Sequence, residues 1–330
     1  MPKAQSLKPR AQSLKPGAKS PKPTIGVIGL GIMGSSMAAN LVKAGYQVLG
    51  YDVVPARRTA HKRTGGMVAR SVADVGRRSA VIICSLPSPG ALIAVATELS
   101  TLQRRRSGAR GGPLFVETST LPIAVKDEAR KLLARAGITA LDAPLSGTGS
   151  QAKVKDIVVY VSGPRAAYKT AAPVMDGFAR GHYYIGPFGD GSKMKFVANL
   201  LVAIHNVAAA EALVLAMKAG LDPALTLKVI GDGGGSSRML QVRGPLMVKG
   251  DYREATMKLD VWQKDMKAIA DFAKDIGCPT PLFATTAPFY IAALAQGRDA
   301  EDTGAVCAVL EEMASYRRPA KRPARGRHGR

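Results

Sequence analysis

Short apolar runs alternate with longer mixed segments over the first half of the chain. Each run has four to six residues, and they fall at 25–29, 46–51, 80–84, 114–117, 138–141, 157–162 and 182–185. Such runs are typical of buried strands, and the segments between them, such as 122–136, have the spacing of crossover helices. The pattern therefore predicts an α/β fold with a mainly parallel, doubly wound sheet.

The pattern changes after Gly191, beyond which no apolar run has the character of a strand. A long helix is expected over 192–219, followed by shorter helices near 223–231, 236–248, 255–276 and 281–296. A stretch with three Gly residues and one Pro, 186–191, separates the two patterns. We therefore expect an α/β domain over 24–188 and an all-helical domain over 189–316.

The longest apolar segment, 196–217, contains the polar residues Asn199, His205, Asn206 and Glu211. These interruptions favour a buried helix over a membrane span. A helix of this length has more apolar surface than one small domain covers. Self-association through the helical half is therefore expected.

Composition adds two basic ends to this picture. The chain has 330 residues, 46% of them hydrophobic, so sizeable cores can form. More than half of the formal net charge of +23 lies in 1–23 and 317–330, which consist largely of Lys, Arg, Pro, Ser and Ala. Both segments are predicted to be disordered tails. They favour salt-sensitive, non-specific contact with polyanions, but no motif for a specific nucleic acid accompanies them.

The cysteines and the N-terminus bear on the compartment. Cys84, Cys278 and Cys307 lack metal-ligand spacing, so no metal site is predicted, and each is expected to be a buried reduced thiol. The N-terminus lacks the apolar stretch of a secretory signal. These features predict a cytoplasmic protein without a membrane partner.

A glycine-rich turn follows the first apolar run. Gly29-Leu30-Gly31-Ile32-Met33-Gly34 comes directly after 25–28 and before a helix-like segment. In such a unit the glycines allow a tight turn, a close approach of the backbone to a pyrophosphate, and packing of the helix on the strand. Asp52 ends the next run at nearly the spacing of the carboxylate that binds the ribose of NAD. Asp52 favours NAD, while Arg57 and Arg58 leave NADP open.

Two further groups of polar residues lie near the boundary of the two halves. Lys195 and Asn199 are one turn apart on the helix that Gly189 and Gly191 open, so they share a face. A lysine there is placed to meet a substrate at the edge of the sheet. The alternative is a surface lysine on an amphipathic helix, and Lys193 competes for the same role.

The second group is the segment Asp142-Ala143-Pro144-Leu145-Ser146-Gly147-Thr148-Gly149. It follows a predicted strand and offers a serine hydroxyl and successive backbone N–H groups. Such N–H groups converge well on a carboxylate. A plain turn is the alternative.

In combination these motifs resemble those of the β-hydroxyacid dehydrogenase family, which includes 3-hydroxyisobutyrate dehydrogenases and the tartronate, glyoxylate and succinic semialdehyde reductases. The matching motifs are the glycine turn with 37–41, the segment 142–147, the segment 189–199, and Lys264-Asp265. They occur in the family's order within about 24–314. The resemblance implies a Rossmann-type NAD(P)-binding domain and an all-helical domain like that of 6-phosphogluconate dehydrogenase, which builds dimers and tetramers.

The resemblance also implies a role for each matching residue. Lys195 would be the catalytic acid or base, and Asn199 would help to hold the substrate. The substrate carboxylate would be bound by Ser146, Gly147 and Thr148. The cofactor would contact the glycine turn, Asp52, Leu86, Pro87, Thr120 and Lys264. The implied reaction is hydride transfer between nicotinamide and a small anionic β-hydroxy acid or semialdehyde.

The chain departs from the family pattern at two positions. The family usually has glycine where Thr148 and Lys155 stand, and both lie near the substrate loop. The identity of the acid therefore stays open. Two other functions remain as alternatives: a polyanion-binding scaffold, which the basic tails suggest, and an imine reductase on the same fold. Lys195 with Ser146-Gly147 favours hydroxy-acid chemistry.

Two more interpretations follow from the chemistry. As a base, Lys195 needs a pKa well below the ordinary value of about 10.4, and burial beside a positive nicotinamide acts in that direction. Arg238 and Arg243 are interpreted as solvated helix arginines, with a second anion contact for a dicarboxylate substrate as the alternative.

Overall fold

A computed structural model describes residues 22–102 and 112–319. The strands form one sheet in the order β3-β2-β1-β4-β5-β6-β8-β7, with β9 paired to β8. Their bounds are β1 Ile25–Ile28, β2 Val48–Tyr51, β3 Met67–Val68, β4 Val81–Cys84, β5 Leu114–Glu117, β6 Thr139–Asp142, β7 Leu145–Ser146, β8 Val158–Ser162 and β9 Gly181–Gly186. The strands from β3 to β6 are parallel, and β8 runs antiparallel to β6. The predicted parallel, doubly wound sheet is confirmed.

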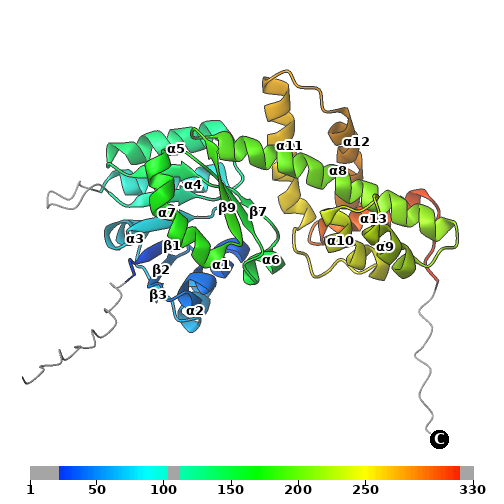
Figure 1. Ribbon diagram of the computed structural model, residues 1–330, viewed down its shortest axis with the longest axis horizontal. Coiled ribbons are helices and arrows are strands. Elements are labelled where there is room, and N and C mark those ends of the chain that lie inside the picture. Colours follow the sequence, from blue (N-terminus) through cyan, green and yellow to red (C-terminus); the bar gives the residue numbers. More distant parts are fainter. Residues whose placement is uncertain (1–21, 103–111, 320–330) are drawn as a thin grey trace, which may run out of the picture.

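Helices cover both faces of this sheet (Figure 1). The helices of this half are α1 Ile32–Lys43, α2 Pro55–Arg63, α3 Val72–Arg78, α4 Pro89–Ser100, α5 Ile123–Arg135, α6 Gly149–Lys153 and α7 Arg165–Phe178. Successive strand residues point to opposite faces, so Val27 packs with α1 and α7 while Ile28 packs with α3, α4 and α5. Each face therefore has its own apolar core.

The second half is helical, as predicted. Its helices are α8 Asp190–Lys218, α9 Pro223–Asp232, α10 Arg238–Lys249, α11 Leu259–Asp275, α12 Pro281–Ala295, the 3-10 turn η1 Thr303–Ala305 and α13 Val306–Met313. Figure 1 shows α8 leaving the sheet and running through the helical half. Helices α10, α11, α12 and α13 pack along α8, and Trp262 and Tyr290 are the largest buried side chains there. This packing fixes α8 between the two halves.

Helix α8 is long and apolar enough to cross a membrane, with a mean hydropathy of 1.9 in its most apolar window. Half of that window is buried inside the protein. The helix also buries Lys195, Asn199 and Asn206. It is the core helix that the sequence predicted.

Several expectations need correction. Strands β3 and β7 have only two residues each, too few for an apolar pattern to predict them. Cys84 and Cys307 are buried as expected, but Cys278 is exposed.

The residues of the two predicted tails that lie next to the folded domains contact those domains, contrary to the prediction of disorder. Lys22 donates to the carbonyl of Ala44 at the end of α1 (2.5 Å), and Arg318 donates to carbonyls at the end of α10 and pairs with Glu311. Both basic side chains thus lie at helix C-termini, where the dipole favours positive charge. The rest of the predicted tails, 1–21 and 320–330, lies outside the described residues.

Candidate active site

The carboxyl ends of the parallel strands meet at one edge of the sheet. Ile28 of β1 is level with Cys84 of β4, Cys84 with Glu117 of β5, and Glu117 with Asp142 of β6. The segments that follow these strands contain the glycine turn, Leu86-Pro87, Thr120 and Ser146, in that order. Strand order reverses direction between β1 and β4, and ligands of such sheets bind in the crevice at that point.

The backbone geometry of the glycine turn requires glycine at two of its three glycine positions. Gly29 has a φ of +88°, and a Cβ atom there would lie 2.1 Å from the carbonyl oxygen of Ser85. A Cβ on Gly34 would lie 1.8 Å from the carbonyl oxygen of Gly29, so helix α1 packs on the turn only with glycine here. A Cβ on Gly31, in contrast, would meet nothing within 4 Å. The first and third glycines serve packing, and the second leaves open space.

The N-terminus of α1 suits an anion. Its N-cap residue is Gly31, which has no side chain to cap the helix, and its first turn contains no acidic residue. Helices α3, α4 and α6 instead have the capping side chains Ser71, Ser88 and Thr148. Uncapped N–H groups and the positive end of the dipole attract phosphate. The open space at Gly31 therefore fits the pyrophosphate of a dinucleotide.

Asp52 fastens the glycine turn to the end of β2. Its Oδ2 accepts a hydrogen bond from the backbone N–H of Leu30 (2.8 Å), and its Oδ1 accepts one from the N–H of Val54 (2.8 Å). Arg57 pairs with the same carboxylate at 3.3 Å. Arg58 donates to the backbone carbonyl of Asp52 (2.7 Å). The carboxylate therefore shapes the turn, and Oδ1 keeps one lone pair that a ribose hydroxyl can use.

Lys195 and Asn199 lie on the buried face of α8, one turn apart. Only 8% of Lys195 and 4% of Asn199 is exposed, whereas Lys193 is exposed and pairs with Asp190. Asn199 Nδ2 donates to Asp265 Oδ2 of α11 (2.9 Å). Of the two lysines that compete for the catalytic role, only Lys195 is therefore buried beside Asn199.

Asp265 connects several of the predicted residues. Besides Asn199 it binds Lys264, whose Nζ lies 2.8 Å from Asp265 Oδ1 and 2.6 Å from the carbonyl oxygen of Thr120. The structure thus brings Thr120, from the sheet edge, together with residues of α8 and α11. Lys264-Asp265 was recognisable as a motif, but the linking role of Asp265 depends on contacts between distant helices.

The surroundings of Lys195 lower its pKa below that of an ordinary lysine, so its neutral amine forms more readily. The pKa of Lys195 is lowered to about 8: burial is the largest cause, Asp265 opposes it, and the positive charges of Lys264 and Lys126 act in the same direction as burial. A lysine with this pKa exchanges its proton around pH 8 and is a free amine above it, as a general base must be.

Sequence reasoning missed a buried charge cluster beneath the site. Lys126 of α5 lies 2.7 Å from Glu117 Oε2 and 2.8 Å from Asp142 Oδ1, with no exposed side-chain surface. Although burial alone lowers the pKa of Lys126, the two carboxylates raise it above its ordinary value. The available signal was a lysine in register with Ala129 and Leu133 on the buried face of α5.

The same cluster holds the start of α8. Asp142 Oδ2 accepts the backbone N–H of Ser192 (2.8 Å), and Asp142 Oδ1 accepts its hydroxyl (2.8 Å). Ser162 Oγ accepts the N–H of Gly191 (2.9 Å). A Cβ on Gly191 would lie 2.5 Å from the carbonyl oxygen of Tyr160. The helix that contains Lys195 is thereby fixed to the sheet one turn before the lysine.

The segment around Ser146 is more structured than a plain turn. Ser146 ends β7, Gly147 has a φ of +136°, and Thr148 caps α6 in a capping box with Gln151. The N–H of Thr148 donates to Gln151 Oε1 (3.0 Å), so this group already has a partner. Lys155, where the family has glycine, keeps the glycine conformation with a φ of +61°.

The two arginines of α10 differ. Arg243 is 2% exposed and pairs with the fully buried Asp302 at 3.1 Å, so its interpretation as a solvated arginine is wrong. Asp302 also accepts hydrogen bonds from Thr256 and Gly304, and Arg243 therefore stabilises the helical core. Arg238 is exposed and reaches Asp156 of the sheet half at 3.1 Å.

Comparisons with known proteins cover both halves. Residues 24–186 match the model of the NAD-binding domain of 6-phosphogluconate dehydrogenase, and 189–310 match the NAD-binding domain of NADP-dependent 3-hydroxyisobutyrate dehydrogenase. L-threonate dehydrogenase of Cupriavidus necator is 32% identical over 87% of this chain and 95% of its own length. 2-(Hydroxymethyl)glutarate dehydrogenase of Eubacterium barkeri is 30% identical over 88% of this chain and 95% of its own length.

Solved structures of other proteins share the fold of this chain. A 3-hydroxyisobutyrate dehydrogenase from Salmonella typhimurium superimposes with a TM-score of 0.77 at 28% identity, covering 87% of this chain and all of that one. An imine reductase from Pseudomonas shares the fold with a TM-score of 0.54 at 20% identity, covering 88% of this chain and 99% of that one.

Proposed function

Since the chain belongs to the β-hydroxyacid dehydrogenase family and is an NAD(P)-dependent oxidoreductase acting on CH–OH groups, we propose that it interconverts a small β-hydroxy acid and its semialdehyde with Lys195 as acid and base. The observation that carries the proposal is the buried Lys195, whose pKa falls to about 8 beside Asn199, Asp265 and Lys264. In this assignment residues 24–188 bind the dinucleotide, and residues 189–316 complete the substrate site.

The proposed chemistry is a coupled transfer of hydride and proton. A bound nicotinamide dinucleotide supplies the hydride acceptor in oxidation and the donor in reduction. In oxidation Lys195 Nζ takes the proton of the substrate hydroxyl as the carbonyl forms, and in reduction it returns that proton. Asp265 holds the amide of Asn199, which leaves the amide oxygen to orient the substrate hydroxyl. Low exposure keeps water from competing for the proton.

The remaining assignments follow the fit of the residues. The glycine turn with the N-terminus of α1 binds the pyrophosphate, and Asp52 binds ribose hydroxyls. Leu86, Pro87, Thr120 and Lys264 border the nicotinamide. Ser146 and Gly147 with Thr148 receive the substrate carboxylate. Because Thr148 already caps α6, we assign most of that binding to Ser146 and Gly147.

We further propose NAD as the preferred coenzyme. The carboxylate of Asp52 repels a 2′-phosphate, and both Arg57 and Arg58 are engaged by Asp52 itself. We also propose a cytoplasmic location and assembly as a homodimer or homotetramer, of which the homodimer is the simpler case.

The first test is a coupled substrate and coenzyme assay on the purified protein. Oxidation of 3-hydroxyisobutyrate, L-threonate, glycerate and 4-hydroxybutyrate is followed at about 340 nm, the NADH absorbance band, with NAD⁺ and with NADP⁺; glyoxylate and succinic semialdehyde test the reverse direction. We expect turnover with a higher kcat/KM for NAD⁺. Lys195→Ala should lower kcat by a factor of about 10² or more and still bind NADH, because general acid–base catalysis contributes about that much.

Lys193→Ala is the matched control, since Lys193 lies two residues away on the exposed face of the same helix. It should keep wild-type kcat. Wild-type turnover in Lys195→Ala contradicts the catalytic assignment. NADH binding without turnover of any acid points to imine reduction, and absence of dinucleotide binding points to the scaffold alternative.

A further inference from the structure

Asp156 lies directly beside the segment that we assign to the substrate carboxylate. Strand β7 pairs with β8 so that Ser146 is opposite Val158, two residues after Asp156. A Cβ atom on Gly147 would lie 3.4 Å from the backbone carbonyl oxygen of Asp156. Because β8 is antiparallel to β6, its N-terminal end is at the edge of the sheet where the parallel strands end. Asp156 is therefore part of the active-site edge.

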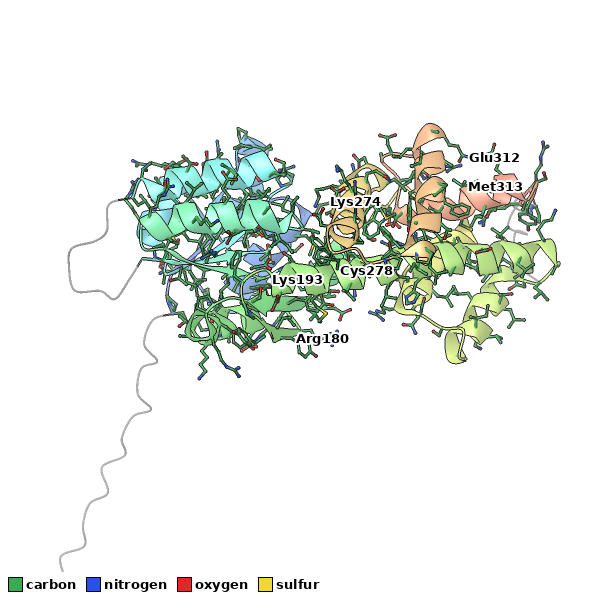
Figure 2. All side chains as sticks on the ribbon, turned by 90° about the horizontal axis from the view of Figure 1, so that it is seen from above. Arg180, Lys193, Lys274, Cys278, Glu312 and Met313 are labelled. Carbon is green, nitrogen blue, oxygen red and sulfur yellow. The ribbon has the colours of Figure 1, made fainter. Side chains whose placement is uncertain are left out.

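Two arginines from different halves converge on this carboxylate. Arg180 precedes β9, and its Nε donates to Asp156 Oδ1 (2.9 Å). Arg238 is the first residue of α10, and its Nη2 donates to Asp156 Oδ2 (3.1 Å). Figure 2 shows Arg180 at the end of the sheet half that faces the helical half. Asp156 thus lies between the two halves of the molecule.

One carboxylate leaves this pair of guanidinium groups with an excess positive charge. The side chains of Arg180 and Arg238 are 65% and 61% exposed, against 30% for Asp156. Within the described residues Arg180 uses only its Nε, and Arg238 adds one long contact to Gln241 (3.4 Å). Both guanidinium groups therefore retain N–H donors for another anion.

We propose that Arg180 and Arg238 form a subsite for a second carboxylate of the substrate, which makes a dicarboxylic β-hydroxy acid the preferred class. The inference rests on the proposed function, because it takes the first carboxylate to lie at Ser146 and Gly147. The guanidinium fork binds carboxylates bidentately, which gives both affinity and geometry. Asp156 orients the two forks and leaves one unit of positive charge for the ligand.

Three hydroxy acids isolate the second charge. 3-Hydroxyisobutyrate and 2-(hydroxymethyl)glutarate share the same reacting hydroxymethyl and carboxylate groups, and the second acid adds a side chain that ends in a carboxylate. 2-(Hydroxymethyl)pentanoate has a side chain of similar length without the charge. We expect the wild type to have a kcat/KM at least about tenfold higher for the glutarate than for the pentanoate, the scale of one charge-assisted hydrogen bond.

Substitution of the arginines should remove this preference selectively. Arg238→Ala and Arg180→Ala should each lower kcat/KM for the glutarate by about tenfold, while 3-hydroxyisobutyrate changes by less than about twofold. Arg238→Lys should restore part of the preference, because an ammonium binds one oxygen at a time. Arg253→Ala is the control, since Arg253 is an exposed arginine of the helical half that pairs with Asp251.

The outcomes separate this inference from the proposed function. Turnover of 3-hydroxyisobutyrate with no preference for the glutarate overturns the subsite and leaves the proposed function intact. An equal loss on all three acids in Arg238→Ala shows that the arginine only joins the two halves, and the subsite is then wrong. No turnover of any of the three acids by the wild type, with the wider panel also silent, overturns the proposed function and the subsite together.

Discussion

Lys195 depends on residues from two other helices. Lys264 and Asp265 approach from α11 and Lys126 from α5, and burial on α8 excludes water. Burial, opposed by Asp265 and assisted by the charges of Lys264 and Lys126, lowers the pKa of Lys195 to about 8. A buried lysine is costly for stability, and such residues cluster at functional sites. The site therefore favours proton exchange over stability.

The pH dependence of activity follows from that pKa. Below about pH 8 Lys195 is an ammonium and has no lone pair for the substrate proton. For oxidation we expect kcat/KM to rise with pH and to level off above about 8. Reduction needs the ammonium, so its kcat/KM should be level at low pH and fall above about 8.

The variant Lys264→Met tests whether the titration of Lys195 causes this pH dependence. It removes a positive charge that lowers the pKa of Lys195, so the rise in the oxidation profile should move to higher pH. Initial rates from pH 6 to 10 on saturating coenzyme measure both profiles. Profiles that are flat, or that move to lower pH in the variant, contradict Lys195 as the titrating group.

Among the elements, α8 depends most on long-range contacts. Its first two N–H groups after Asp190 bind Ser162 and Asp142, which belong to β8 and β6. Asp142 in turn shares Lys126 with Glu117 of β5. One buried cation thus joins α5, two strands and the start of the helix that contains Lys195.

We expect Lys126→Met to destabilise the protein by about 3–5 kcal/mol, the cost of leaving buried charge without its partner. Lys131→Met is the matched control: Lys131 lies on the same helix, is 68% exposed and pairs with Asp127. An exposed pair of that kind contributes less than about 1 kcal/mol. Urea unfolding of both variants at pH 7 measures the difference. Equal unfolding midpoints would show that the buried cluster adds nothing to stability.

These elements also show what the sequence can predict. The longer parallel strands and most of the helices were predictable, because each such strand is an apolar run and the segments between the runs have the spacing of helices. The glycine turn was recognisable because strand, turn and helix are contiguous. Lys126 and Arg243 were not, because their partners are distant in sequence: Asp142 follows Lys126 by 16 residues, and Asp302 follows Arg243 by 59. The register that brings Glu117 level with Asp142 has no local signal.

At the scale of the whole molecule, one apolar surface has no partner within the described residues. A groove of about 620 Å³ lies between the end of α8 and α9, and is lined by Ala212, Leu215, Ala216, Ala219, Leu221, Asp222, Leu225, Thr226, Val229 and Ile230. Leu215, Leu225 and Val229 are 71%, 59% and 61% exposed. Contiguous apolar surface of this kind marks an interaction site in soluble proteins. The proposed homodimer buries it with a second copy of the chain.

A charge placed in this groove should separate the copies. Leu215→Glu would bury a carboxylate against the partner's apolar side chains without a counter-charge, which a dimer does not tolerate. By light scattering after size exclusion we expect the wild type at twice the mass of the 34.6 kDa chain and Leu215→Glu at the mass of one chain. Met313→Glu is the control, because Met313 is 67% exposed at the end of α13 and does not line the groove. A wild type that elutes as one chain contradicts the homodimer. An unchanged assembly in Leu215→Glu shows instead that the copies meet elsewhere.

The groove lies at the end of α8 remote from Lys195. The monomeric variant should therefore keep the coenzyme affinity of the wild type, while its free energy of unfolding falls. That combination distinguishes lost assembly from a damaged active site.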